Sequence, residues 1–143
     1  MEHRGAATLI PRRAALEPAY RRTPYRVDGP AGPVTLRIGR REPGTAMLLR
    51  ALATHEAVLL TAHNPASRRR APGWNRRAQR RLEEALRRVP ALAGCSVAGG
   101  WSEAQRLLPI DVRRGAVLAR RFRQNALVLL RRAQAPRLVW VAG

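Results

Sequence analysis

Residues 57–67 read AVLLTAHNPAS, an apolar run that passes directly into a polar motif. A short, continuous apolar run of this kind is typical of an interior strand of a sheet. Residues 122–130 read FRQNALVLL, where a polar motif instead precedes the apolar run. Polar groups at the ends of buried strands are a common way to build a binding site in α/β sheets. The two stretches therefore predict two buried strands with a candidate site at their ends.

The same pattern extends outward along the chain. Turn residues and short apolar or alternating runs predict strands at residues 24–28, 34–38, 57–61, 94–98, 106–112, 126–130 and 137–141. Apolar residues at helical spacing predict helices at residues 45–54, 75–89 and 116–124. The segment 101–103 is expected to lie in a connection. The predicted order of elements is ββαβαββαββ.

This order predicts the fold class. Strands that alternate with helices need crossover connections, which imply at least some parallel pairing. Strands that follow one another at both ends of the chain favour antiparallel pairs as well. We therefore expect an α/β protein, with α+β as an open alternative. It should form a single mixed sheet of about six to seven strands with about three packed helices.

The chain length of 143 residues fits one domain. Residues 1–19 are expected to be an N-terminal extension with at most a short helical turn near residues 14–19. Residues 20–143 are expected to form a single globular domain. Hydrophobic residues make up 45% of the chain but aromatic residues only 4%, so Leu, Val and Ala should fill the core.

The helix at residues 75–89 has the clearest amphipathic pattern. Asn75 is expected to cap it, and Pro90 to end it. A single apolar stripe should face the sheet, formed by Ala78, Leu82, Ala85, Leu86 and Val89. Arg side chains cover much of the remaining surface and should lie in solvent. Thr45 is the expected cap of the helix at residues 45–54.

The net charge of +19 has two competing explanations. All 28 basic residues are Arg, whose guanidinium group pairs bidentately with phosphate, so the charge favours an anionic partner. GC-rich codons, however, enrich Ala, Arg, Gly and Pro together. The complete absence of Lys favours this codon explanation. In either case the charge should make non-specific binding to polyanions strong at low salt.

The composition also bears on the compartment. Cys95 is the only cysteine, which excludes an internal disulfide and an all-cysteine metal site and fits a reducing environment. No apolar stretch approaches the roughly 20 residues of a membrane span. The first residues lack the apolar segment of a secretion signal. We therefore expect a cytoplasmic protein with no membrane partner.

Several short motifs, taken in order, resemble an uncharacterised bacterial family, the domain-of-unknown-function family 3293. They are YRRTPYRV at residues 20–27, TAHNPAS at 61–67, Asn75 at the start of a Leu-rich helix, WSE at 101–103 and FRQNA at 122–126. The resemblance covers the chain from about Ala19 to Trp140. It supports the fold and the site, and it implies no activity.

Two positions depart from the family pattern. Arg123 stands where the family tends to have Gly, so the end of the preceding helix is expected to lose a left-handed cap. Ala104 and Gln105 stand where the family pattern has Pro-Ser. The first departure is expected to reshape the candidate site.

The candidate ligand-binding residues are those of the polar motifs: Thr61, His63, Asn64, Ser67, Asn75, Gln124 and Asn125. A helix N-terminus beside them would favour an anion. The two motifs meet only if the strands at residues 57–61 and 126–130 run antiparallel. Purely structural roles remain open: Asn64 in a turn, Asn75 as a cap, and Gln124 and Asn125 as partners of buried backbone groups.

Groups for catalysis are scarce. Glu103 and Asp111 are the only acids beyond the helix at residues 75–89. His3, His55 and His63 lack the spacing of a zinc site, and no glycine-rich phosphate loop is present, so no metal and no cofactor are expected. Cys95 has no nucleophile context and should be buried and inert.

Three functions therefore remain open. The chain is a binding module for an anionic or nucleotide-like small molecule, or a non-specific nucleic-acid-associated protein, or an enzyme that uses His63 or Glu103. For the second function, the contact to a polyanion is expected at Arg68, Arg69 and Arg70.

Overall fold

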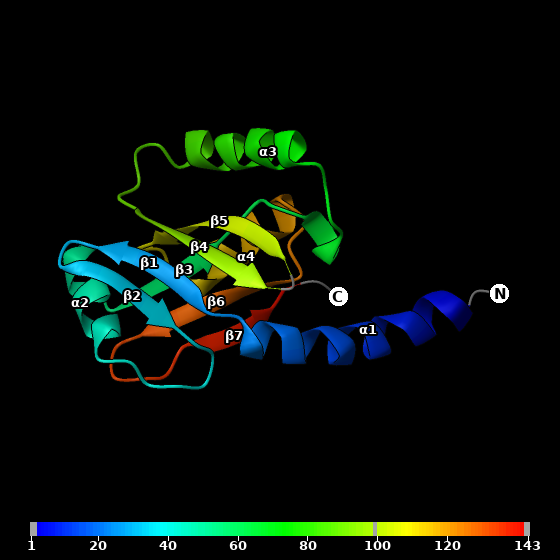
Figure 1. The fold of residues 1–143 in the computed structure, drawn as a ribbon, viewed down its shortest axis with the longest axis horizontal. Coiled ribbons are helices and arrows are strands. Elements are labelled where there is room, and N and C mark those ends of the chain that lie inside the picture. Colours follow the sequence, from blue (N-terminus) through cyan, green and yellow to red (C-terminus); the bar gives the residue numbers. More distant parts are fainter. Residues whose placement is uncertain (1–2, 99, 142–143) are drawn as a thin grey trace.

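The computed structural model describes residues 3–98 and 100–141, which form one seven-stranded sheet with helices on both faces (Figure 1). The strands are β1 (Tyr25–Gly29), β2 (Gly32–Leu36), β3 (Glu56–Leu60), β4 (Leu92–Ala98), β5 (Trp101–Leu108), β6 (Ala126–Arg131) and β7 (Arg137–Trp140). The helices are α1 (His3–Arg22), α2 (Gly44–Ala51), α3 (Pro72–Ala85) and α4 (Val112–Arg121), with a short 3-10 turn, η1 (Pro65–Ser67). From β1 onward the order is the predicted ββαβαββαββ, and the mixed α/β class is confirmed.

The strand order in the sheet is β2-β1-β4-β5-β3-β6-β7, and every neighbouring pair among the described residues is antiparallel. The expected parallel pairing is therefore wrong. The crossovers do join strands that run in the same direction, but another strand lies between them. β5 separates β3 from β4, and β3 separates β5 from β6. The sequence pattern predicts that the two strands joined by a helix run in the same direction. It does not predict which strand lies between them in the sheet.

The core has two halves, one on each face of the sheet. Leu59 of β3 points to the face covered by α2 and by Tyr20 of α1. Val58 and Leu60 point to the opposite face, which α3 and α4 cover. Burial on both faces explains why β3 has a continuous apolar run and no alternation.

Helix α3 begins earlier and ends earlier than predicted. Pro72 occupies its first turn and Ala71 is its N-cap, so the expectation that Asn75 caps the helix is wrong. Ala78 and Leu82 are buried against the sheet, as the stripe predicted. The regular helix stops at Ala85, and Leu86 is only half-buried.

The other boundary corrections have local causes. Helix α2 starts at Gly44 after Pro43, so Thr45 lies inside the helix and does not cap it. Residues 101–103 belong to β5 and not to a connection. Helix α4 begins at Val112 because the carboxylate of Asp111 accepts the Arg114 backbone N–H at 2.8 Å and caps it.

The N-terminal segment is a helix of 20 residues where a short turn at most was expected. Pro11 and Pro18 lie within its span and disfavour a helix by local propensity. Its last turn contacts the sheet, where the Tyr20 ring meets the Trp140 ring edge-on at 5.5 Å. This contact brings the end of α1 against β7 (Figure 1). Within the described residues, no helix has the length and apolar character that crossing a membrane requires.

Candidate functional site

The two polar motifs meet at one end of the sheet. β3 and β6 are antiparallel neighbours, so the end of β3 lies beside the start of β6. The side-chain amide of Gln124 donates to the carbonyl oxygen of His63 at 3.0 Å. The side-chain amide of Asn125 donates to Ser67 Oγ at 2.8 Å. These bonds confirm that the motifs contact each other.

The loop after β3 is held in an unusual backbone conformation. Asn64, Ala66 and Ser67 have φ values of 48°, 57° and 58°, in the left-handed region that residues with a side chain rarely adopt. Each such residue costs about 1 kcal/mol or more. The Ala66 N–H donates to the Arg123 carbonyl at 2.7 Å, which helps to fix the loop. Strain held in this way is often found at binding sites.

A reciprocal pair of asparagines fixes the orientation of the site. The Asn64 N–H donates to Asn75 Oδ1, and Asn75 Nδ2 donates to Asn64 Oδ1, both at 2.9 Å. The Arg70 N–H also donates to Asn64 Oδ1, at 2.8 Å. Because that oxygen is occupied by two donors, Asn64 Nδ2 must face the other way, and it donates to Glu103 Oε2 at 2.8 Å. Asn75 is therefore a buried bridge that aims Asn64 at Glu103.

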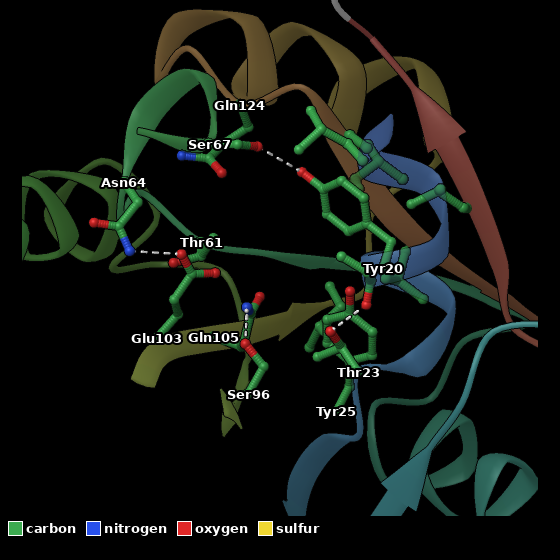
Figure 2. Close-up of a pocket in the computed structure, with 17 residues that line it drawn as sticks. Tyr20, Thr23, Tyr25, Thr61, Asn64, Ser67, Ser96, Glu103, Gln105 and Gln124 are labelled. Atoms are coloured by element: carbon green, nitrogen blue, oxygen red, sulfur yellow. Dashed lines mark hydrogen bonds between the residues drawn. The ribbon is translucent and has the colours of Figure 1, made fainter. Parts of the chain in front are cut away.

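Beside this network lies a cavity of about 170 Å³, between the end of α1 and the sheet (Figure 2). Its apolar wall comes mainly from Leu59, Leu127, Val128 and Leu138. The polar side chains that line it converge from α1, β1, β3, η1, β4, β5 and β6 and their flanks. They are Tyr20, Thr23, Tyr25, Thr61, Asn64, Ser67, Ser96, Glu103, Gln105 and Gln124.

Glu103 gives the cavity an acidic centre. Burial raises the pKa of this carboxyl, and the hydrogen bond from Asn64 opposes the shift. Burial also raises the pKa of Tyr25, which the nearby acidic groups of Tyr20 and Glu103 raise further, while a hydrogen bond with Thr23 lowers it. Among the described residues that line the cavity there is no Arg and no His. The site is thus acidic and rich in hydroxyl groups.

Residues 60–127 match the family described as "Protein of unknown function (DUF3293)". The central part of the chain is therefore similar to DUF3293 proteins. The match spans both polar motifs, Asn75 and Glu103. No curated protein and no solved structure matches this chain.

The residues predicted for the site fall into two groups. Thr61, Asn64, Ser67 and Gln124 line the cavity. Asn75 and Asn125 stand behind it and hold Asn64 and Ser67 in place.

His63 contributes its backbone to the site, because its carbonyl accepts from Gln124 and its N–H donates to Thr61 Oγ1 at 3.0 Å. Its imidazole is not among the groups lining the cavity. Burial lowers the pKa of this imidazole, against the opposing effects of the Ser102 carbonyl and the Glu83 charge. The imidazole therefore lies outside the cavity.

Five polar residues that line the cavity were not predicted from the sequence: Tyr20, Thr23, Tyr25, Ser96 and Gln105. The YRRTPYRV motif carried a signal for the first three, since it belongs to the family resemblance. Ser96 and Gln105 are joined across β4 and β5 by a hydrogen bond of 3.1 Å from Gln105 Nε2. Gln105 and Glu103 are two residues apart on β5 and share a face of the sheet. A strand predicted over residues 101–105 would have placed the two side chains side by side.

Helix α4 keeps its left-handed cap despite Arg123. Arg123 has a φ of 55°, and its N–H donates to the Arg120 carbonyl at 3.0 Å. The Gln124 N–H donates to the Ala119 carbonyl at 2.8 Å, which completes a Schellman motif. The expected loss of this cap is wrong, because Arg occupies the conformation that Gly prefers.

Arg68, Arg69 and Arg70 are exposed on the loop before α3 and do not line the cavity. Exposed arginines also occur on α1, α2, α4, β1 and β7, for example Arg21, Arg50, Arg113, Arg26 and Arg137. Exposed arginines therefore lie on several elements of the fold and not on this loop alone. Within the described residues, no group of three or more His, Cys, Asp or Glu side chains is arranged to hold a metal ion.

Proposed function

We propose that this protein is a binding module for a small polar molecule, held in the cavity between α1 and the sheet. One observation carries the proposal: ten polar side chains converge on a cavity of about 170 Å³ with an apolar wall. An apolar pocket with a few convergent polar groups is the usual form of a small-molecule site. The size fits a ligand smaller than a drug-like molecule, since such pockets measure about 300–1,000 Å³.

The lining favours a neutral or amine-bearing ligand. Glu103 is the only acidic residue among the described residues of the lining, and no basic side chain stands there to neutralise an anion. An amine would pair with the carboxylate of Glu103, and a neutral ligand would accept from its protonated form. The lining does not support the anionic or nucleotide-like ligand expected from composition.

The polar groups are preorganised to select such a ligand. Ser67 Oγ accepts a hydrogen bond from the Asn125 side-chain amide and lies 3.2 Å from the Tyr20 hydroxyl. These groups are therefore held together near the C-terminal end of α1. Gln105 uses its amide nitrogen on Ser96, which leaves its oxygen as an acceptor. Groups fixed by other bonds bind a ligand at a lower entropic cost.

A thermal-shift screen of small neutral, amine-bearing and anionic metabolites, followed by calorimetry on the hits, tests this proposal. The hits should be neutral or cationic. Glu103→Gln and Ser67→Ala should each weaken binding by about tenfold or more, as expected for a lost buried contact. Ser102→Ala is the matched control, because Ser102 adjoins Glu103 on β5 but is exposed. Hits that are all anionic, or that bind both cavity variants normally, would contradict the proposal.

A polyanion contact at Arg68, Arg69 and Arg70 is a second, weaker proposal. Three consecutive exposed arginines and a net charge of +19 support it. Contacts of this kind with phosphate groups give attraction without sequence preference.

A further inference from the structure

A second concave site lies on the far side of the sheet from α1. It is a groove of about 300 Å³ between α3 and the C-terminal end of α4. The residues that line it are Ala62, Pro65, Arg70, Trp74, Ala78, Arg81, Arg121, Phe122 and Arg123. We propose that this groove binds a ligand that carries two or more phosphate groups.

The groove is strongly basic. Four of the nine lining residues are arginines, and none of the nine is acidic. The nearest acids on α3 are engaged elsewhere, since Glu83 pairs with Arg106 at 3.2 Å and Glu84 pairs with Arg87. Within residues 3–98 and 100–141, no ion pair involves any of the four arginines of the groove. Four like charges around one groove repel one another until an anion neutralises them.

Two of the four guanidinium groups are held against aromatic rings. The Arg70 guanidinium lies over the Trp74 ring at 5.1 Å, and the Arg121 guanidinium lies over the Phe122 ring at 5.6 Å. A cation–π contact of this kind does not itself consume the N–H donors of a guanidinium. Those donors match the oxygens of a phosphate bidentately. The two rings therefore hold arginines in place for an oxyanion without consuming their hydrogen bonds.

The backbone of α3 and of the end of α4 sets the two walls of the groove. Trp74, Ala78 and Arg81 are spaced four and three residues apart and form one stripe along α3, so one face of that helix makes a wall of the groove. At the opposite wall, the Schellman motif sets Arg123 in its left-handed conformation, just beyond the end of α4. The volume suits a small molecule with several charges better than one phosphate alone.

This groove is distinct from the cavity of the proposed function. The two share no lining residue. One is acidic and the other basic, so they should take ligands of opposite character. Failure of either proposal leaves the other standing.

Calorimetric titration with inorganic pyrophosphate, at about 150 mM salt to screen diffuse attraction, tests the groove. Saturable binding of one pyrophosphate per chain is expected. The double variant Arg121→Gln with Arg123→Gln should lose about tenfold or more in affinity. The control pair Arg113→Gln with Arg114→Gln removes the same charge from exposed positions of the same helix and should change affinity by less than about twofold.

A third variant separates binding from folding. Arg123→Gly relieves the left-handed backbone of this residue, so it should fold at least as stably as the parent and still bind pyrophosphate more weakly. Equal losses in the two double variants, or no saturable binding, would overturn the proposal. Tight binding of a single-stranded oligonucleotide that depends on the groove, with no binding of pyrophosphate, would also overturn it.

Discussion

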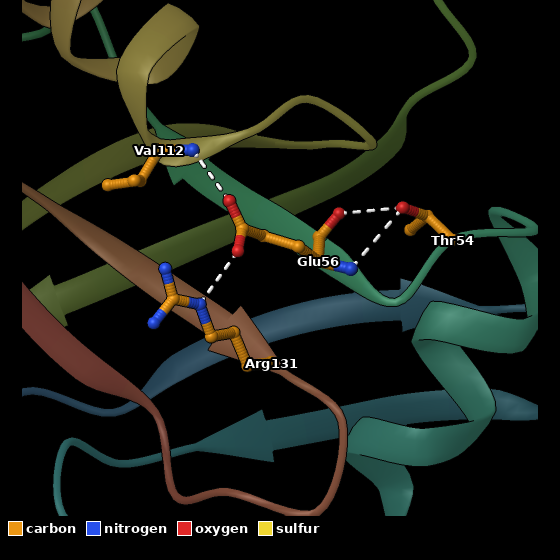
Figure 3. A network of polar contacts seen from close by, with 4 residues as sticks. All are labelled: Thr54, Glu56, Val112 and Arg131. Carbon is orange, nitrogen blue, oxygen red and sulfur yellow. Dashed lines mark hydrogen bonds and ion pairs between the residues drawn. The ribbon is translucent and has the colours of Figure 1, made fainter.

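Glu56 Oε2 accepts a hydrogen bond of 2.7 Å from the backbone N–H of Val112, the first residue of α4 (Figure 3). Its other oxygen, Oε1, pairs with Arg131 Nε of β6 at 2.7 Å. One carboxylate on an interior strand, β3, thus anchors a helix N-terminus and a neighbouring strand, both of which arrive more than fifty residues later in the chain.

Removal of this carboxylate should destabilise the fold. Glu56→Ala should lower the free energy of unfolding by about 1–2 kcal/mol, since a helix-terminal N–H and a half-buried ion pair both lose their partner. Chemical denaturation measures the effect. Glu84→Ala is the control, because its pair with Arg87 is exposed, and it should cost no more than about 0.5 kcal/mol. Equal costs would show that the Glu56 contacts contribute no more than a surface pair.

Asn75→Ala should have a larger effect than its place on a helix suggests. The change leaves the buried Asn64 N–H without its acceptor and Asn64 Oδ1 with one donor fewer, at a cost of about 1–3 kcal/mol. Arg76→Ala, on the exposed side of the same helix, should change stability by no more than about 0.5 kcal/mol. Denaturation of the two variants decides the matter, and similar values would refute the role of Asn75 as a bridge.

Arg123→Gly should stabilise the protein by about 0.5–1 kcal/mol. The left-handed conformation of Arg123 costs energy that Gly does not, and the greater freedom of Gly in the unfolded chain offsets part of the gain. Arg121→Gly, at the last residue of α4, should instead destabilise by up to about 1 kcal/mol. The thermal midpoints of the two variants should therefore move in opposite directions.

The buried carboxyl of Glu103 should make stability depend on pH. Because its folded-state pKa is raised above the usual 4.5, the folded protein keeps this proton where the unfolded chain has already released it. The stabilising contribution is full below the usual pKa and is lost as pH rises through the raised value. Glu103→Gln removes this dependence, so the variant should gain stability relative to the parent between about pH 4 and 7. Exposed Glu84→Gln is the control, and parallel pH profiles for Glu103→Gln and the parent would contradict the burial of charge at Glu103.

Replacement of Arg68, Arg69 and Arg70 by Ser should weaken binding to all nucleic acids alike. If roughly five phosphates are neutralised, the logarithmic salt slope of the parent should be about −3.5 to −4.5, and the variant should have a flatter slope. Titration of random and fixed oligonucleotides at several salt concentrations measures it. A strong preference for one sequence at physiological salt would show that bases are read directly.

The sequence predicted helices and strands correctly where their buried residues form a clear apolar pattern. The predictions of β3 and β6 were correct because their apolar runs are buried in the core. The prediction that Ala78 and Leu82 of α3 face the sheet was also correct, since both are buried. Helix α1 was missed because its prolines disfavour a helix locally and its contacts lie at its last turns. The sheet pairing was missed because periodicity carries no information on which strand enters between two others.

The candidate site was half predictable for a similar reason. The motifs around Asn64 and Gln124 were visible because polar residues interrupt apolar strands. Tyr25 and Ser96 were not, since each is an ordinary inward residue of a strand until the pairing of β1 with β4 brings them opposite one another. The role of Asn75 depended on a partner eleven residues away that only the folded loop supplies.

The position of β3 also bears on how the chain folds during synthesis. Among the described residues, β3 pairs only with β5 and β6, so both of its edges stay open until residues 101–131 have been made. Pairing between segments so far apart in sequence raises the contact order and slows folding. Until then the AVLL run is an apolar segment of high strand propensity with nothing to cover it, the kind of segment that nascent chains aggregate through and that chaperones protect.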